Sequence, residues 1–277
     1  MSAASAEPMD KRPIGVFDSG LGGLTAVKEL RRILPNEDIV YFGDTGRVPY
    51  GTRSDETIIK YARSDMDFLL KHNPKRVLIA CGTVSTVALG LLKEEYSLPI
   101  DGVVEAAVAA AANATKNRRI GIMGTSATIR SGAYERLLRQ KDSGIQTFSA
   151  ACPLLVPLVE NGRLSPDDVV ISTVVSEYLA DIKAAGVDAL IMGCTHYPLL
   201  EPVVSAFMGE GVKLISPGRE AASLIAAEMA ADGTCNSPDH EGGAEYFVSD
   251  SVSGFSGLAE TFLREKVTGS VSHVDIE

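Results

Sequence analysis

Short apolar runs alternate with amphipathic segments along almost the whole chain, and this alternation constrains the fold more than any other feature. We expect strands, rich in apolar residues and bounded by turn residues, at 14–17, 39–42, 77–80, 100–103, 120–123, 189–192 and 212–215. We expect amphipathic helices at 24–34, 55–71, 131–139, 166–185 and 219–231, and a buried helix at 103–112. Strands and helices that alternate in this way predict a parallel α/β fold.

Local signals mark some of the ends of these elements. Ser54 and Ser165 each precede acidic residues, a pattern typical of a capped helix start. The segment 232–243 is rich in Gly, Ser, Pro and Asp, so we expect a surface loop there.

Size and charge exclude several classes of protein. A chain of 277 residues can form one large or two medium domains. The net charge is −10 and no Lys/Arg-rich block occurs, which argues against nucleic acid or an anionic membrane as the main partner. No apolar run approaches the ~18 residues of a membrane span. Residues 1–12 lack the pattern of a signal peptide, so we expect a flexible leader and a cytoplasmic protein.

The four cysteines are too few for a disulfide framework in a chain of this length. No Cys-x-x-Cys occurs. Cys194 and His196 offer at most two metal ligands in one motif, and the other histidines lie outside motif-like settings. We therefore expect no metal.

A weak internal repeat suggests two related lobes. Ile14-Gly-Val-Phe-Asp-Ser-Gly is similar to Ile120-Gly-Ile-Met-Gly-Thr-Ser, and Leu78-Ile-Ala-Cys-Gly-Thr is similar to Leu190-Ile-Met-Gly-Cys-Thr. The two pairs occur in the same order at similar spacing. The alternative is that any two α/β halves share the same strand, loop and helix order.

Cys81 and Cys194 stand in matching places in these repeats, each at the end of an expected strand. The carboxyl ends of parallel strands form the edge at which α/β folds bind ligands. Two thiols that face one substrate from opposite sides suit the removal of a proton from one face of a carbon and its return to the other. A helix N-terminus after each cysteine is expected to lower the pKa of its thiol. We interpret Cys152 and Cys235 as ordinary cysteines.

The glycine-rich loop 17–23 also follows a strand, but it lacks the Gly-x-Gly-x-x-Gly spacing of phosphate loops. The carboxylate of Asp18 would repel phosphate. A ligand with both charge signs fits better: Ser19 and backbone amides for a carboxylate, Asp18 for an ammonium group or as a general base. A tight turn with an acidic cap is the alternative.

The loop 43–52 and the end of an expected helix supply further candidates. Tyr50 can offer a hydroxyl and Gly51 a close backbone approach, whereas Asp44 and Arg47 either act on a ligand or simply pair. Glu160 has the pattern of an ordinary residue at a helix end.

Five motifs in order resemble the bacterial glutamate racemases. They are Ile14-Gly-Val-Phe-Asp-Ser-Gly-x-Gly-Gly, Gly43-Asp-Thr-x-Arg-Val-Pro-Tyr-Gly, Ala80-Cys-x-Thr, Ala151-Cys-Pro-Leu-Leu-Val-Pro-Leu-Val-Glu and Gly193-Cys-Thr-His-Tyr-Pro-Leu-Leu. The similarity extends from about Pro13 to Phe262. It implies a cofactor-independent enzyme that interconverts L- and D-glutamate, with the D isomer used for peptidoglycan.

The resemblance also implies an architecture. Two similar three-layer αβα lobes with parallel-type sheets enclose the active site, and the second lobe is inserted into the first. We expect lobe 1 at 13–104 plus 216–277 and lobe 2 at 105–215, with a homodimer as the assembly.

Carried over residue by residue, the resemblance assigns Cys81 to the D isomer and Cys194 to the L isomer. Asp18 and His196 would assist the thiols, with Asp44 and Glu160 as supporting acids. The residues that would hold glutamate are Asp18, Ser19, Tyr50, Gly51, Gly82, Thr83, Thr195 and His196.

The sequence departs from the family pattern at two places. Gly82 stands where the family usually has Asn, which keeps the backbone amide but removes a side-chain hydrogen bond of roughly 0.5–1.5 kcal/mol. Glu105-Ala106 replaces the usual Glu-Pro at the crossing between the lobes.

Three other readings stay open. An aspartate racemase or another superfamily member would have the same two thiols and a different pocket. A hydrolase with Cys194 as nucleophile and His196 as base would not need Cys81. A catalytically silent amino-acid-binding protein would bind without exchange of the α-proton.

Overall fold

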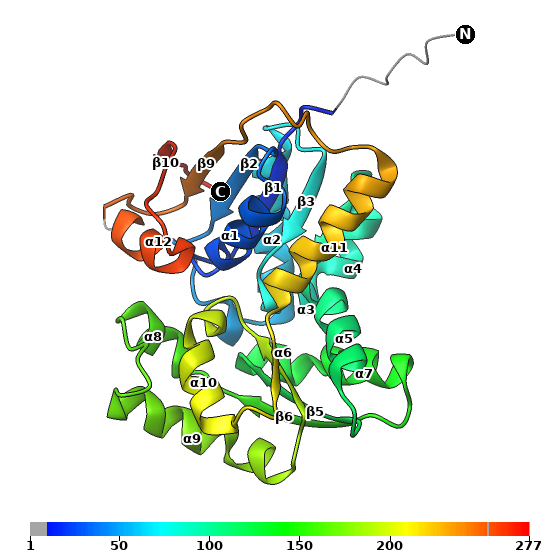
Figure 1. Ribbon diagram of the computed structural model, residues 1–277. Helices are drawn as coiled ribbons and strands as arrows, with labels where there is room; N and C mark the ends of the chain where they lie inside the picture. The colour runs from blue at the N-terminus through cyan, green and yellow to red at the C-terminus, as the bar shows by residue number, and fades with distance from the viewer. Residues whose placement is uncertain (1–9, 254, 277) are drawn as a thin grey trace, which may run out of the picture.

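Two parallel sheets form the framework of the protein in a computed structural model that describes residues 10–253 and 255–276 (Figure 1). The first sheet has the order β10-β9-β2-β1-β3-β4 and the second the order β6-β5-β7-β8. The strands of the first sheet are β1 (Ile14–Asp18), β2 (Ile39–Gly43), β3 (Arg76–Ile79), β4 (Ile100–Gly102), β9 (Ala244–Val248) and β10 (Val271–His273). Those of the second are β5 (Arg119–Gly124), β6 (Gln146–Ala151), β7 (Ala189–Gly193) and β8 (Lys213–Ile215).

The helices connect these strands. They are α1 (Leu24–Ile33), α2 (Asp55–Leu70), α3 (Gly82–Val87), α4 (Leu89–Glu95), α5 (Val103–Ala114), α6 (Ser126–Ser131), α7 (Ala133–Lys141), α8 (Leu155–Glu160), α9 (Val169–Ala184), α10 (Glu201–Met208), α11 (Pro217–Asp232) and α12 (Phe255–Leu263). Two short 3₁₀ turns, η1 (Tyr50–Thr52) and η2 (Tyr197–Leu200), complete them.

The two sheets share one strand order, which confirms the expected similarity of the halves. In the first sheet β1 lies between β2 and β3, with β4 outside β3; in the second, β5 lies between β6 and β7, with β8 outside β7. Cys81 follows β3 and Cys194 follows β7, so the two cysteines occupy equivalent positions.

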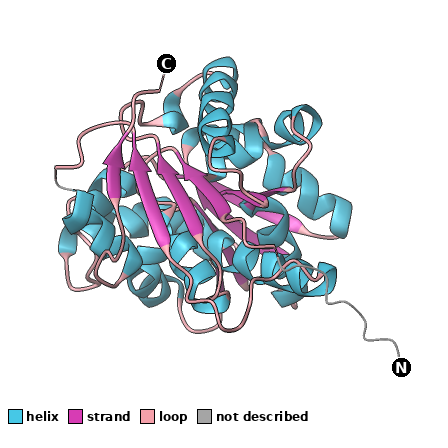
Figure 2. Cartoon of the chain, turned by 90° about the horizontal axis from the view of Figure 1, so that it is seen from above, coloured by secondary structure: helices cyan, strands magenta, loops and turns pink. Residues whose placement is uncertain are grey.

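Helices cover both faces of each sheet, as Figure 2 shows from above. Alternate side chains along a strand point to opposite faces. In β1, Val16 packs in a core shared with α1 and α11, whereas Phe17 packs in a core shared with α2, α3 and α4. In β5, Met123 faces a core shared with α9 and α10, and Ile122 faces α5 and α7. Each sheet is therefore the middle of three layers.

All seven expected strands are present, each within one residue of its expected ends. The sequence did not predict β6, β9 or β10. β6 is an edge strand that pairs only with β5, and its half-exposed Gln-Thr-Phe-Ser-Ala-Ala has no apolar run. β9 alternates buried and more exposed residues, and β10 is three residues long.

Two helix predictions need correction. The helix expected at 166–185 begins at Val169, because the side chain of Asp168 caps it by accepting from the backbone N–H of Val170 at 2.9 Å. The helix expected at 131–139 begins at Ala133 as α7, because Gly132 before it has a left-handed φ of 60°, and the separate helix α6 before Gly132 was not expected. The helices α2, α5 and α11 agree closely with expectation.

The segment after α11 is only partly at the surface. Asn236 is buried, and its backbone N–H donates to the Glu37 carboxylate at 2.6 Å. Residues 1–9 of the expected leader lie outside the described residues, and the carbonyl of Asp10 accepts from Lys75 Nζ at 2.8 Å. The expected lobe boundaries, at 104/105 and 215/216, stay a prediction. Among the described residues, no helix combines the length and apolar character needed to cross a membrane.

Candidate active site

A cavity of about 360 Å³ lies where the carboxyl ends of strands from the two sheets meet. Both cysteines of the internal repeat line it. Its walls come from Ser19, Gly20, Val48, Pro49, Tyr50, Gly51, Thr52, Cys81, Gly82, Thr83, Thr125, Ser126, Pro153, Val156, Pro157, Glu160, Gly193, Cys194, Thr195 and His196. Residues far apart in the sequence thus converge on one enclosed space.

Glycines let the two halves approach closely beside this cavity. A β-carbon on Gly22 would lie 2.2 Å from Thr195 Oγ1 and 2.5 Å from His196 Nδ1, so any larger residue would collide with the second half. Beside it, the Thr25 hydroxyl donates to the carbonyl of Thr195 at 3.0 Å. Packing between the halves therefore requires glycine at position 22.

Cys81 lies between the end of β3 and the first residue of α3 and is 5% exposed. Its thiol donates to the hydroxyl of Ser19 at 3.5 Å. Burial, followed by the nearby charge of Asp18, raises the pKa of the Cys81 thiol to about 12. The expected net lowering at a helix N-terminus is wrong for Cys81, because burial and the charge of Asp18 outweigh the lowering by Ser19 and by the backbone N–H of Val84 in α3. Cys81 is therefore a neutral thiol near neutral pH.

Asp18 is buried at the end of β1 and does not itself line the cavity. Its Oδ2 accepts from the backbone N–H groups of Gly20 at 3.2 Å and Gly23 at 3.0 Å. Its Oδ1 has no hydrogen-bond partner among the described residues. Burial raises the pKa of Asp18, and the charge of His196 opposes this shift. Asp18 Oδ1 is therefore available to bind a proton or to accept a hydrogen bond.

On the opposite wall, Cys194 follows β7 and contacts His196. The distance from Cys194 Sγ to His196 Nδ1 is 4.0 Å, and His196 Nε2 lies 3.1 Å from Glu160 Oε1. Burial opposes protonation of His196, but the hydrogen bonds to Cys194 and Glu160 and the charges of Cys194 and Asp18 raise its pKa to about 10. His196 is thus an imidazolium near neutral pH, with an N–H toward each partner. Its ring packs nearly perpendicular to the ring of Phe262, with 5.0 Å between the centroids.

Tyr50 lines the cavity, but its hydroxyl does not face a ligand as the sequence suggested. The hydroxyl donates to Asp44, a fully buried residue outside the cavity lining. Asp44 also accepts from Arg47 Nε at 2.6 Å and from the Ser249 hydroxyl at 2.6 Å. Asp44 and Arg47 therefore pair with each other, the alternative that the sequence left open.

The other expected binding residues line the cavity: Ser19, Gly51, Gly82, Thr83 and Thr195.

Sequence reasoning missed Thr125, which also lines the cavity and whose hydroxyl lies 3.0 Å from that of Thr83. The internal repeat contained the signal for it, because Thr125 occupies in β5 and its loop the position that Ser19 occupies after β1. The apolar wall of Pro153, Val156 and Pro157 had no comparable signal.

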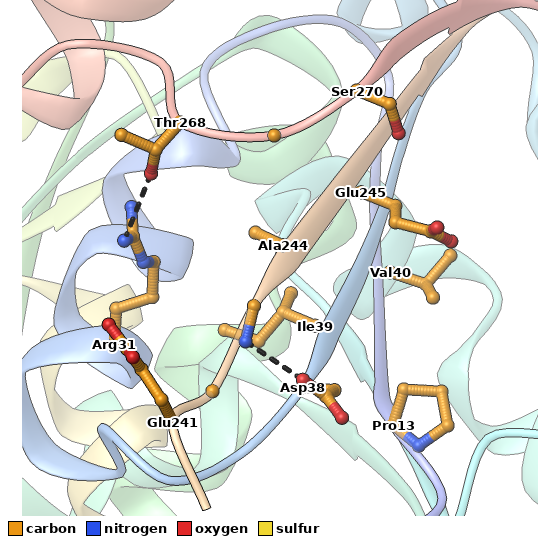
Figure 3. A pocket seen from close by; sticks show the side chains of 13 residues that line it. Pro13, Arg31, Asp38, Ile39, Val40, Glu241, Ala244, Glu245, Thr268 and Ser270 are labelled. Carbon is orange, nitrogen blue, oxygen red and sulfur yellow. Dashed lines mark hydrogen bonds between the residues drawn. The ribbon is translucent and has the colours of Figure 1, made fainter.

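A larger hollow of about 740 Å³ lies at the opposite edge of the first sheet, near the amino ends of β2 and β9 (Figure 3). Its lining includes Asp38, Glu241, Glu245 and Arg31, but no cysteine or histidine. The two cysteines of the internal repeat line the smaller cavity and not this one. Within the described residues, no three His, Cys, Asp or Glu side chains gather closely enough to hold a metal ion.

Comparison with known proteins agrees with this geometry. A family model described as Asp/Glu/Hydantoin racemase matches residues 21–225. The glutamate racemase of Geobacter metallireducens is 41% identical over 269 residues, covering 97% of this chain and 98% of that protein.

Solved structures agree as well. The Bacillus anthracis glutamate racemase isoform has a TM-score of 0.90 at 37% identity, covering 95% of this chain and 97% of that chain. The Francisella tularensis glutamate racemase, solved with D-glutamate, has a TM-score of 0.89 at 36% identity, covering 96% of this chain and 98% of that chain. An aspartate racemase of Picrophilus torridus, with a TM-score of 0.55 at 17% identity, shares the fold alone.

The fold and the site define a two-lobed α/β protein that carries one thiol on each wall of a shared cavity. The chain belongs to the Asp/Glu/hydantoin racemase family.

Proposed function

We propose that this protein is a glutamate racemase that needs no cofactor and supplies D-glutamate for peptidoglycan. The observation that carries the proposal is the presence of Cys81 and Cys194 on one cavity, at equivalent positions in two similar sheets. The similarity to glutamate racemases over nearly the whole chain supports glutamate as the substrate.

In the direction from L to D, the thiolate of Cys194 takes the α-proton, and the bonding electron pair stays on the substrate as a carbanion. The thiol of Cys81 then delivers its proton to the opposite face of the carbon. The raised pKa of Cys81 suits this role, because the group already carries its proton near neutral pH. His196, as an imidazolium, can donate its Nδ1 proton to the thiolate of Cys194 and, once neutral, can take a proton back from the Cys194 thiol.

In the direction from D to L, Cys81 must first lose its proton. Asp18 is the acceptor that we propose, since its Oδ1 is unpartnered among the described residues and its charge acts on Cys81. After each turnover, the cysteine that began as a thiolate is protonated and the one that began as a thiol is ionised. Transfer of one proton between them through the assisting groups returns both to their starting states. Glu160 supports His196, and Asp44 acts only through Tyr50.

The cavity lining suits an amino acid. Hydroxyls of Ser19, Thr83 and Thr195 and the backbone amides beside them can hold carboxylates, with Gly51 and Gly82 allowing close approach. Among the described lining residues, Glu160 and His196 are the charged side chains. Fixed hydrogen bonds to the reacting carboxylate in an enclosed site are the means to stabilise the carbanion.

The test is α-proton exchange followed by NMR, with L-glutamate or L-aspartate incubated with the protein in D₂O without added cofactor. Loss of the glutamate α-signal with appearance of the D isomer is the expected result. Exchange of aspartate instead would make the protein an aspartate racemase. Binding without exchange would favour the silent amino-acid-binding protein.

Assembly and location complete the proposal. We propose a homodimer in the cytoplasm, on the resemblance to the family and on the composition of the chain. Sedimentation analysis of the purified protein tests the dimer, and fractionation of cells tests the location.

A further inference from the structure

A buried polar network stands behind the Tyr50 wall of the cavity. Asp65, on α2, is fully buried and was not singled out by the sequence. Arg47 Nη2 donates to Asp65 Oδ1 at 2.8 Å, while Arg47 Nε donates to Asp44 at 2.6 Å. The hydroxyl of Tyr50 contacts carboxylate oxygens of both Asp44 and Asp65, the latter at 3.2 Å. The guanidinium of Arg47 and the phenol of Tyr50 thus both contact the same two buried carboxyl groups.

The donors around Asp44 and Asp65 are too few to satisfy both side chains if both are ionised. Oδ2 of Asp44 accepts from both Arg47 and Tyr50, and Oδ1 accepts from Ser249 at 2.6 Å, so Asp44 has the partners of an ionised group. The Tyr50 hydroxyl has a single proton and can donate it to only one of the two carboxyl groups, and Asp44, which has the partners of an ionised group, is the better acceptor. The remaining contact, between Tyr50 and Asp65 Oδ2, then needs a proton from Asp65.

We propose that Asp65 is a protonated, uncharged positioning residue that donates to the Tyr50 hydroxyl and so holds the Tyr50–Gly51 wall of the cavity in place. The expected effect on catalysis rests on the proposed racemase function, whereas the protonation of Asp65 does not. The resulting chain of donors runs from Asp65 to Tyr50 to Asp44.

The electrostatic surroundings of Asp65 agree with this assignment. Burial, followed by the charge of Asp44, raises the pKa of Asp65 well above its usual range, and Arg47 opposes the shift. Asp18 adds to the rise from the neighbouring strand. Two like charges beside one cation favour the neutral form of one of them.

The network also reaches the other lobe. A β-carbon on Gly51 would lie 2.9 Å from Cβ of Thr125, so the loop that Tyr50 anchors fits directly against the start of α6. On its other side, the Arg47 guanidinium stacks over the ring of Tyr61 at 4.3 Å. A shift of Tyr50 therefore moves the cavity wall toward or away from Thr125, although Asp65 touches no substrate.

Two substitutions of Asp65 distinguish a protonated side chain from an ionised one. In Asp65→Asn the amide oxygen can accept from Arg47 and the amide N–H can donate to Tyr50, as the protonated acid does. We expect this variant to keep KM for L-glutamate within about threefold of the native value, whereas Asp65→Ala raises KM roughly tenfold with a smaller change in kcat. Asp67→Asn, an exposed change on the same helix, is the matched control. Equal damage from Asn and Ala would show an ionised Asp65 and overturn the proposal, as would native KM in both variants.

Infrared difference spectra between the native protein and each variant measure the protonation state of Asp65 independently of catalytic activity. Near neutral pH, the native protein should show the C=O stretch of a protonated carboxylic acid that disappears in Asp65→Asn and persists in Asp67→Asn. Absence of this band overturns the proposal even if the protein racemises glutamate. Its presence in a protein that racemises nothing would leave the proton assignment standing and overturn the proposed function alone.

Discussion

Gly82 and Gly193 touch across the boundary between the two sheets. A β-carbon on Gly82 would lie 2.7 Å from the carbonyl oxygen of Gly193, closer than real side chains approach a backbone. Cys81 immediately precedes the first glycine and Cys194 immediately follows the second. The close approach of the two glycines therefore lies next to both thiols in the chain.

The family usually accommodates Asn at this position, so a β-carbon there requires the backbone around Gly82 and Gly193 to shift. In this chain, where the two glycines approach closely, we expect Gly82→Ala to force such a shift and to misplace the sulfurs relative to the α-carbon. Misplacement on the ångström scale lowers rates by up to about 10²-fold, so we expect kcat/KM for glutamate to fall roughly 10–100-fold. Kinetics in both directions measure the effect. Gly90→Ala is the control, because nothing lies within 4 Å of a β-carbon there. That change should leave activity unaltered and stabilise the protein by about 0.4–1 kcal/mol. Native activity in Gly82→Ala would show that this contact does not position the thiols.

Each thiol is predicted to be essential for inversion. Cys81→Ser should lower racemisation by about 10²–10⁴-fold in both directions, because a hydroxyl is a far poorer acid and base at this position. Racemisation assays starting from each isomer measure the loss, and Cys235→Ser, in the half-exposed loop after α11, is the control. A hydrolase that uses Cys194 and His196 would tolerate the loss of Cys81, so a hydrolytic activity that persists in Cys81→Ser, with no racemisation by the native protein, would support that rival. Full racemisation in Cys81→Ser would contradict the two-thiol mechanism.

The framework of this fold could be predicted because its strands are buried on both faces. The first four residues of β1 and all of β7 form continuous apolar runs, and both strands are fully buried. β6 could not be found in the same way, since only one neighbour pairs with it and its exposed side needs no apolar residue. The helix after Ser165 was placed too early because Asp168, rather than Ser165, provides the cap.

The site residues near the strand ends could be predicted from the repeat and the motifs, but their electrostatics could not. Sequence places Cys81 at a helix start, yet its pKa depends on how deeply the folded chain buries it and on the charge of Asp18. The orientation of the Tyr50 hydroxyl depends on Asp65, which lies 15 residues away in sequence. Such pairings are set by tertiary packing, and no local pattern reports them.

The charge of Asp18 should control the reactivity of Cys81. Burial is the larger cause of the raised pKa, and the Asp18 carboxylate is the next, so thiolate forms only as the pH rises toward about 12. Asp18→Asn removes the negative charge, which lowers the pKa of Cys81 and increases the thiolate fraction at any pH below it.

We therefore expect faster alkylation of Cys81 by iodoacetamide in Asp18→Asn, measured by mass spectrometry of the Cys81 peptide between about pH 7 and 10. The Cys235 peptide in the same samples is the internal control. The same variant should lose racemisation from D-glutamate, because it lacks the proposed acceptor for the Cys81 proton. Unchanged or slower alkylation would show that the Asp18 charge does not act on this thiol.

The ion pair between Glu160 and His196 gives the last prediction. Hydrogen bonds to Cys194 and Glu160 outweigh burial and hold the pKa of His196 near about 10, compared with 6.5 for a free histidine. Glu160→Gln removes the charge 3.1 Å from Nε2, so the pKa of His196 should fall. NMR titration of the ring resonances measures the shift, with His240, which contacts Asp38 elsewhere, as the internal reference.

The raised pKa also sets the sign of the stability change. A group that binds its proton more tightly in the folded state stabilises the protein fully below its unfolded pKa, here 6.5, and this contribution is lost as the pH rises through the folded value of about 10. Because Glu160→Gln lowers the folded value, the difference in melting temperature from the native protein should be largest at low pH within this range and should shrink as the pH approaches about 10. A melting-temperature difference that grows with pH would mean that the pair stabilises the neutral imidazole instead.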